Sequence, residues 1–247
     1  MGNRQMPQII VIGESCVDVF VYCEAERLAP DLPIPILTTN QKVESPGMAS
    51  NVFRNIKSKH PETSLLTNAN WEKTTKTRFV HEASNHTFFR LDHSAPVNPI
   101  DLTDVDFKSE LIVISDYNKG FLTENAIESI CESHPNVFLD TKKILGEWAR
   151  YAKYIKINDF EYRNSKKYIT KELDEKIIHT AGKLGCFFQG ENYPVIEQEV
   201  RDASGAGDSF MAALVVEYLN SQDIISSINS ANLAASEVVQ HRGVGVI

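Results

Sequence analysis

The chain has 247 residues, of which 42% are hydrophobic and 23% charged, and its formal net charge is −8. This composition is typical of a globular domain that can bury a large core. The acidic balance argues against general nucleic-acid binding, which needs a basic face, and no apolar run approaches the ~20 residues of a membrane span. The start, Met1 to Pro7, lacks the apolar segment of a signal peptide, so we expect a cytoplasmic protein without a membrane partner.

Short apolar strands alternate with helical stretches along the chain, which predicts an α/β fold with a mostly parallel sheet and helices on both faces. We expect one domain over residues 1–247. The expected strands are Ile9–Gly13, Ser64–Leu66, Leu111–Ser115, Val137–Asp140 and Tyr154–Ile157. The expected helices are Ala49–Lys59, Thr123–Ser133, Gly207–Leu219 and Asp223–Gln240, with Thr123 as a capping residue.

Two stretches break this alternation. The first holds extended segments at Val17–Tyr22 and Ile34–Val43 around a Pro-rich turn. In the second, two extended segments flank the polar Glu82–His86, as in a hairpin. We interpret both, about residues 17–43 and 77–92, as a small β-rich lid that projects from the main sheet. The alternative is that they are ordinary edge strands.

The strongest chemical signal is the run D-A-S-G-A-G-D, from Asp202 to Asp208, which precedes an apolar helical stretch. Small residues let backbone N–H groups approach a ligand closely, and at a helix N-terminus these groups form an anion site. Asp208 could take a proton from an attacking hydroxyl while the N–H groups of Gly205, Ala206 and Gly207 hold a transferring phosphoryl group. Taken alone, the run is equally compatible with a Gly-rich turn in which Asp208 is a plain helix-start acid.

This run resembles the D-x-x-G-A-G-D signature of the PfkB/ribokinase family of carbohydrate kinases. Further pieces resemble the family in the same order along nearly the whole chain. Asp18 corresponds to the sugar-binding Asp after the family's first strand, and Gly47 and Asn51 belong to a segment similar to its sugar loop. Asn158 and Glu161 are similar to its N-x-x-E element, Thr180, Gly182 and Gly185 to its nucleotide loop, and Asn232 to its adenine-side helix.

The resemblance implies a ribokinase-like fold and an enzyme that transfers phosphate from ATP, with Mg²⁺, to a sugar hydroxyl. It implies that Asp208 is the catalytic base, that Asn158 and the nucleotide loop hold ATP, and that Glu161 and Asp202 organise the metal. A lid with one apolar face is also expected to pair, so a homodimer through the lid is expected.

Within the family, the kinase domain of the heptose 7-phosphate kinases is the most similar. The likeness rests on Arg27–Pro35, Phe89–Asp92, Ser115–Gly120 and Leu139–Lys142. It implies transfer to the anomeric oxygen of a heptose phosphate, and it implies substrate contacts by Arg27, Arg90, Asp92, Lys119 and Lys142. For Arg90, Lys119 and Lys142, the alternative is solvated surface charge. We expect the second, nucleotidyltransferase domain of bifunctional members to be absent.

The sequence departs from the family pattern in four places. Met48 stands where the sugar loop usually has a second Gly, and Ala203 replaces the usual Thr. Thr67–Lys76 is too short for the strand and helix usually inserted there, and Tyr162–Thr180 is abbreviated, so the chain is shortened relative to the family. The two shortened segments favour a second hypothesis, in which an impaired family member binds a sugar or nucleotide without turnover.

A third hypothesis is a kinase of the same family for another hydroxyl substrate, such as a nucleoside. Retention of Asp208, Asn158 and Glu161 favours an active kinase over a binding module. The chain has no G-x-x-x-x-G-K-[ST] loop, which argues against a P-loop kinase. Its cysteines form no C-x-x-C pair, so we expect free thiols at Cys16, Cys23, Cys131 and Cys186.

Overall fold

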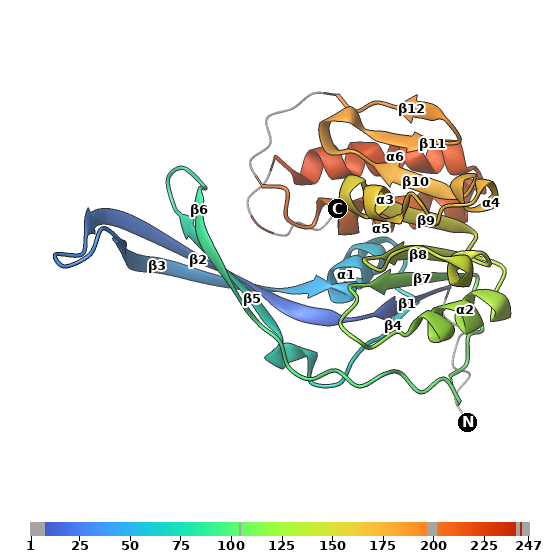
Figure 1. Ribbon diagram of the computed structural model, residues 1–247, viewed down its shortest axis with the longest axis horizontal. Helices are drawn as coiled ribbons and strands as arrows, with labels where there is room; N and C mark the ends of the chain where they lie inside the picture. Colours follow the sequence, from blue (N-terminus) through green and yellow to red (C-terminus); the bar gives the residue numbers. More distant parts are fainter. Residues whose placement is uncertain (1–7, 104, 197–201, 241–242, 244–247) are drawn as a thin grey trace.

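A central eight-stranded sheet carries the fold, in the order β12-β11-β10-β9-β8-β7-β1-β4 (Figure 1). The computed structural model describes residues 8–103, 105–196, 202–240 and 243. Strands β4, β1, β7, β8, β9 and β10 are parallel, and β11 and β12 add an antiparallel edge. The strands are β1 (Ile9–Gly13), β4 (Thr63–Leu66), β7 (Leu111–Asp116), β8 (Val137–Thr141), β9 (Tyr154–Asn158), β10 (Ile177–Thr180), β11 (Cys186–Phe188) and β12 (Glu191–Tyr193).

Helices cover both faces of this sheet, and alternate residues of β1 show the two layers. Ile9 and Val11 pack in one cluster with α1 (Ala49–Lys59), α5 (Ala206–Ser221) and α6 (Ile224–Val238). Ile10 and Ile12 pack in the other cluster with α2 (Glu124–Ser133). A strand that is buried on both faces has apolar residues at successive positions, as in the I-I-V-I run of Ile9–Ile12. The predicted mostly parallel sheet with helices on both faces is confirmed.

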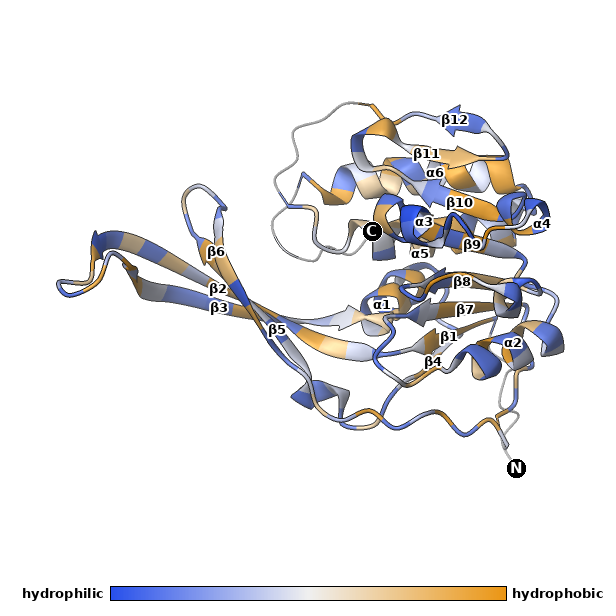
Figure 2. Ribbon diagram, viewed as in Figure 1, coloured by the Kyte–Doolittle hydropathy of each residue, from blue (hydrophilic) through white to orange (hydrophobic). Residues whose placement is uncertain are grey.

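A second, four-stranded sheet projects from this body, in the order β3-β2-β5-β6 (Figure 1). β2 pairs antiparallel with β3 and parallel with β5, and β5 pairs antiparallel with β6. Figure 2 shows hydrophilic and hydrophobic residues alternating along its strands, as in a sheet with two unlike faces. The separate β-rich layer is therefore confirmed, and the edge-strand alternative is wrong; the layer is called the lid below, and its role as a lid stays a prediction. The strands are β2 (Ser15–Leu28), β3 (Pro35–Met48), β5 (Thr75–His81) and β6 (Thr87–His93).

The abbreviated stretch before Thr180 keeps a strand of the main sheet. α3 (Asp159–Ser165) and the four-residue α4 (Lys171–Asp174) lead into β10, which pairs in parallel with β9. The sequence analysis predicted neither these helices nor the three strands that follow, because each element is too short for a period to be read.

Other expectations concern single features. The hydroxyl of Thr123 accepts the N–H of Ala126 and caps α2 as predicted. The four cysteines are buried and free. Within the residues described, no helix combines the length and the apolar character needed to cross a bilayer.

Candidate active site

Asp208 lies in the first turn of α5 and is 7% exposed. Gly205, directly before the helix, has φ of 80°, a left-handed conformation that suits glycine. The Tyr117 hydroxyl donates to Asp208 Oδ1 at 2.6 Å, and the Asn51 amide donates to Oδ2 at 3.0 Å. Burial raises the pKa of Asp208, and these two hydrogen bonds act in the opposite direction. The carboxylate is thus held by both oxygens at a helix start.

The lid brings a second carboxylate toward this point. Asp18 of β2 accepts from Arg78 Nη1 of β5 at 2.8 Å. A Cβ atom at Gly47 would lie 2.1 Å from Asp18 Oδ2, so a larger residue at this position would displace the Asp18 side chain. Arg54 donates to Asn51 Oδ1 at 3.2 Å, and the Asp18 charge partly offsets the lowering of the Arg54 pKa by burial. Asp18, Gly47 and Asn51 therefore lie together on the lid side of Asp208.

A buried ion pair lies behind the turn that precedes Asp208. Lys156 of β9 donates to Asp140 Oδ2 of β8 at 2.8 Å, and the two side chains are 3% and 4% exposed. Burial alone would raise the pKa of Asp140, but Lys156 and Lys142 together lower it below its ordinary value. Lys156 Nζ lies 3.0 Å from the place that a Cβ atom on Gly207 would take. This ammonium group therefore faces the expected phosphoryl-binding turn.

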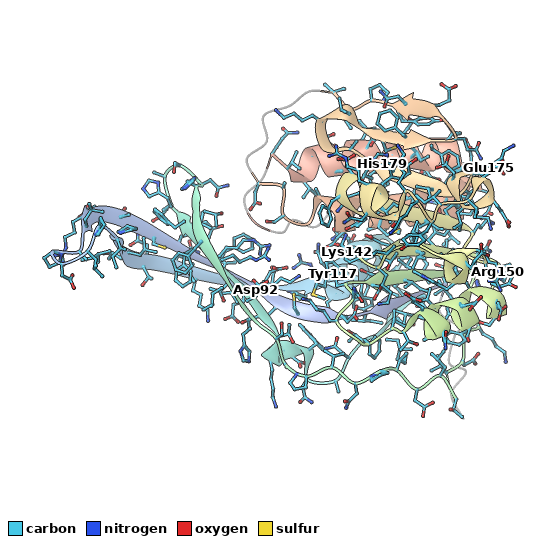
Figure 3. All side chains as sticks on the ribbon, in the orientation of Figure 1. Asp92, Tyr117, Lys142, Arg150, Glu175 and His179 are labelled. Carbon is cyan, nitrogen blue, oxygen red and sulfur yellow. The ribbon has the colours of Figure 1, made fainter. Side chains whose placement is uncertain are left out.

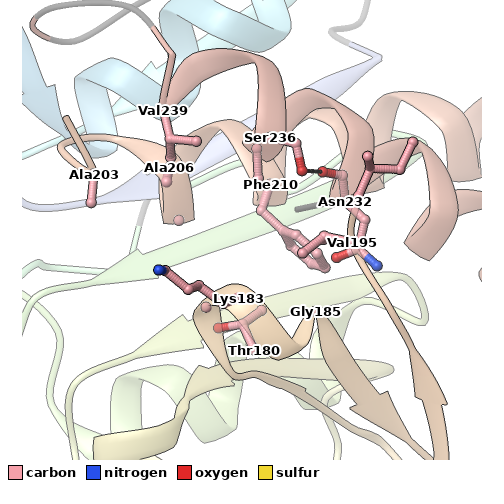
Figure 4. A pocket seen from close by; sticks show the side chains of 14 residues that line it. Thr180, Lys183, Gly185, Val195, Ala203, Ala206, Phe210, Asn232, Ser236 and Val239 are labelled. Atoms are coloured by element: carbon pink, nitrogen blue, oxygen red, sulfur yellow. Dashed lines mark hydrogen bonds between the residues drawn. The ribbon is translucent and has the colours of Figure 1, made fainter. Parts of the chain in front are cut away.

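A cavity of about 390 Å³ opens on the other side of that turn (Figure 4). The predicted nucleotide-loop and adenine-side residues Thr180, Gly182, Gly185 and Asn232 all line it. Its apolar walls would suit a planar base, and they come from Val195, Ile196, Phe210, Ala235 and Val239. Ala206 and Gly207 also line the cavity, so it reaches the residue directly before Asp208.

Glu161 and Asn158 form a capping box at the start of α3. Glu161 Oε2 accepts the Asn158 backbone N–H at 2.7 Å, Oε1 accepts the Asn158 amide at 2.8 Å, and Lys142 Nζ lies 2.7 Å from Oε1. Asp202 is engaged differently, since its oxygens accept the backbone N–H groups of Ser204 and Gly243. The described part of the chain holds no group of three or more His, Cys, Asp or Glu side chains that could bind a metal. Carboxylates already bonded in this way fit a magnesium ion that is held mainly by phosphate and water.

Comparison with known proteins agrees with this arrangement. Residues 58–246 match the model of the pfkB family carbohydrate kinases. The chain belongs to this family. The bifunctional protein HldE of Helicobacter pylori (strain Shi470) is 28% identical over 96% of this chain and 64% of the relative. HldE of Campylobacter jejuni (strain RM1221) is 26% identical over 98% of this chain and 63% of the relative. The chain thus spans less than two thirds of the length of these curated relatives.

Solved structures support the same pfkB-family fold. The ribokinase of Thermotoga maritima has a TM-score of 0.71 at 16% identity and covers 96% of this chain and 94% of its own. Arabidopsis thaliana ribokinase complexed with ribose and ATP has a TM-score of 0.69 at 15% identity, and the match covers 97% of this chain and 94% of the ribokinase. The alignment to the Helicobacter protein runs over 298 positions against a chain of 247 residues, which agrees with a shortened family member.

The structure separates the residues that were predicted to bind substrate. Arg90 lies directly opposite Arg78 in the lid and donates to both oxygens of Asp92, at 2.8 and 3.0 Å. In β2, Arg27 lies nine positions beyond Asp18, or roughly 30 Å along an extended strand. Arg27 therefore does not reach the site of its own chain, which corrects the prediction from the motif.

The two predicted lysines differ in the contacts that they make. Lys142 bridges Glu161 and Asp140, at 2.7 and 3.7 Å, and Figure 3 shows it beside Tyr117. Lys119 is exposed and donates its backbone N–H to Glu14. Of the three N–H groups expected to hold the phosphoryl group, that of Ala206 donates to Ala203 O at 3.3 Å.

The sequence analysis missed four residues of this site. Asp140 and Lys156 are charged positions at the ends of apolar strands, V-F-L-D and Y-I-K, and such positions meet at the carboxyl edge of a parallel sheet. Tyr117 stands inside the S-D-Y-N-K-G segment, which was noticed without a role for its ring. No local sequence pattern indicates a role for Arg78, because its contact with Asp18 depends on the pairing of β2 with β5.

Proposed function

We propose that this protein transfers the γ-phosphate of ATP to a hydroxyl of a sugar or sugar phosphate, with Asp208 as the general base. One observation carries the proposal. The cavity reaches Ala206 and Gly207, directly before Asp208, while Asn51, just after the lid strand that meets Asp18, donates to the Asp208 carboxylate itself. Asp208 thus stands between a nucleotide-sized cavity and a polar sugar side.

The residues present suit the steps of such a transfer. A sugar hydroxyl attacks poorly until its proton has an acceptor, and Asp208 supplies one. The N-terminus of α5 favours negative charge, and Lys156 and Lys142 add positive charge on the phosphoryl side. ATP would supply the phosphoryl group, and Mg²⁺ would offset the charge of its phosphates, with Glu161 and Asn158 behind the bound water.

A coupled assay of ADP release on sugars, sugar phosphates and nucleosides tests the proposal. We expect turnover with at least one sugar or sugar phosphate, loss of turnover in EDTA and recovery with Mg²⁺. ATP binding without ADP release on any substrate would instead favour a binding module. Preference for nucleosides would favour the kinase for another hydroxyl.

A phosphorylated sugar is the substrate that the lid favours. Opposed residues of paired strands share one face of the sheet, so Arg78 and Arg90 lie together, with Lys76 one step nearer the body. Arg78 already contacts Asp18, and so this basic face adjoins the sugar side. Arg78 is paired with Asp18 and Arg90 with Asp92, so Lys76 leaves this face with one further positive charge for a phosphate group to meet. A heptose 7-phosphate-like substrate fits this distribution of charge.

Arg90→Ala should therefore raise KM for the phosphorylated sugar by about tenfold, which is the effect expected from losing one charge-assisted hydrogen bond. The KM for the corresponding free sugar should not change. Arg27→Ala is the matched control, since it removes a lid arginine that lies away from Asp18. Steady-state kinetics on both sugars give the comparison. An equal rise in both KM values, or the same rise in Arg27→Ala, would contradict a phosphate contact.

We also propose that the lid pairs with a second copy of the chain. Phe79 and Phe89 stack at 4.6 Å, on the face opposite to Arg78 and Arg90. On the same face, Phe89 is 50% exposed and Leu91 is 60% exposed. Burial of such neighbouring apolar side chains is favourable. Sedimentation velocity should show a dimer that dissociates in Leu91→Asp, and a wild-type monomer at micromolar concentration would refute the pairing.

A further inference from the structure

Tyr117 joins the catalytic carboxylate to both parts of the molecule. Its hydroxyl donates to Asp208 Oδ1 at 2.6 Å. Lys76 Nζ, from lid strand β5, lies 4.8 Å from the centre of its ring, and Lys142 Nζ, from the body, lies 5.5 Å from it. Figure 3 places Tyr117 beside Lys142, where the lid meets the body. Contacts between a cation and an aromatic ring restrain the ring.

The backbone of Tyr117 is held by a buried carboxylate. Glu14, at the end of β1, is 1% exposed. Its Oε2 accepts the N–H of Tyr117 at 2.8 Å, and its Oε1 accepts those of Lys119 and Phe121 at 3.0 and 3.1 Å. Hydrogen bonds to a charged acceptor are stronger than neutral ones. The loop that carries Tyr117 is therefore wrapped around one fixed group.

The residue before Tyr117 is anchored as well. Asp116 is buried and accepts from Lys143 Nζ at 2.9 and 3.1 Å. The hydroxyl of Thr141 donates to the same carboxylate. The direction of the Tyr117 side chain is thus set from both ends of its loop, and such support is what a precisely placed group needs.

We propose that Tyr117 is a positioning residue for the base: its hydroxyl holds Asp208 through Oδ1, so that Oδ2, which accepts one bond from Asn51, turns its second lone pair to the substrate hydroxyl. This inference rests on the proposed function above. Burial and the neighbouring Asp208 raise the pKa of Tyr117 well above its ordinary value, so the hydroxyl keeps its proton and remains a donor. Tyr117 orients the base and does not itself take the proton.

Several charged and titratable groups surround Asp208, and they come from five elements packed around it. These are Cys16 and Asp18 of β2, Tyr117 after β7, Asp140 and Lys142 at and after β8, Lys156 of β9, and Arg54 of α1, which is connected through Asn51. Burial raises the pKa of Asp208, while the bond from Tyr117 lowers it. Removal of the hydroxyl should therefore raise the pKa further and leave less of the base ionised at a given pH.

Tyr117→Phe keeps the ring and removes the hydroxyl. We expect the acid limb of kcat/KM for the sugar, at saturating ATP, to move up by about one pH unit. Near the wild-type limb the rate should fall about tenfold and then recover at higher pH. KM for ATP should not change. The matched control is Tyr154→Phe, since Tyr154 packs against Phe138 and Phe188 in the core, and its profile should coincide with wild type.

A second measurement needs no turnover. The carboxyl titration of Asp208, followed by ¹³C NMR and assigned by its absence in Asp208→Asn, should shift upward in Tyr117→Phe and not in Tyr154→Phe. An unchanged acid limb together with an unchanged titration overturns the role of Tyr117. If Asp208→Asn is inactive in the same experiment, the proposed function stands even so. If the wild type transfers no phosphate, the proposed function fails, and the titration still decides the hydrogen bond.

Discussion

Asp208→Asn should lower kcat by ~10²–10⁴-fold, the usual effect of losing a general base. Asparagine keeps the size of the side chain and can occupy the same place at the start of α5, but it cannot accept the proton of the sugar hydroxyl. The KM values for ATP and sugar should change little, because neither the cavity nor the Asp18 side is altered. The melting temperature should stay near wild type. Steady-state kinetics and thermal unfolding on one preparation give both values.

Asp223→Asn is the matched control for this variant. Asp223 also begins a helix, since its side chain accepts the N–H groups of Ile225 and Ser226 at the start of α6. Asparagine caps a helix about as well as aspartate, so this variant should keep both activity and stability. If Asp208 were only a helix-start acid, the two variants would behave alike. An active Asp208→Asn enzyme would therefore make the binding module the better account.

Lys156→Met should destabilise the fold by ~3–5 kcal/mol, because it leaves the buried Asp140 carboxylate without its closest cation. For a chain of this size the melting temperature should fall by roughly 6–20 °C. Urea unfolding at neutral pH measures the free energy directly. The double variant Lys156→Met, Asp140→Leu should recover much of the stability, because apolar groups of similar size can replace a buried ion pair. It should not recover activity, since the ammonium group facing Gly207 is gone.

The effect of Lys156→Met should depend on pH. The pKa of Asp140 is lowered in the folded protein, so the stabilisation by its ion pair is present above the unfolded pKa of about 3.9. It is lost as pH falls through the lower, folded value. The gap in unfolding free energy between wild type and variant should therefore narrow as pH falls below about 4. If the unfolding free energy of Lys156→Met at neutral pH lay within ~1 kcal/mol of the wild-type value, the ion pair would contribute little to stability.

The body of the fold could be predicted because its signals are local. β1 and α1 were predicted with their observed ends, since a short apolar run and a helical period are each complete within a few residues. The nucleotide-loop residues Thr180, Gly182 and Gly185 were also found by their motif, and they line one cavity. Each of these features depends on neighbours along the chain.

The lid side of the site could not be predicted in the same way. The β2 strand was expected to end at Tyr22, but it continues to Leu28, and this extension carries Arg27 away from Asp18. Arg78 and Tyr117 reach their carboxylate partners across 60 and 91 positions of sequence. Contacts between such distant positions depend on strand register and on how the loops are anchored, and no local sequence pattern shows either of these.

The central claim is transfer of phosphate from ATP to a sugar hydroxyl, and the fate of the labelled phosphate tests it most directly. Wild-type protein with Mg²⁺ and γ-³²P-ATP should be incubated with heptose 7-phosphate and, separately, without sugar. The account predicts label in a heptose bisphosphate, one ADP for each product molecule, and negligible release of label without sugar. Unconsumed ATP with this and every other sugar or sugar phosphate tested, or label released to water at the same rate with and without sugar, would contradict it.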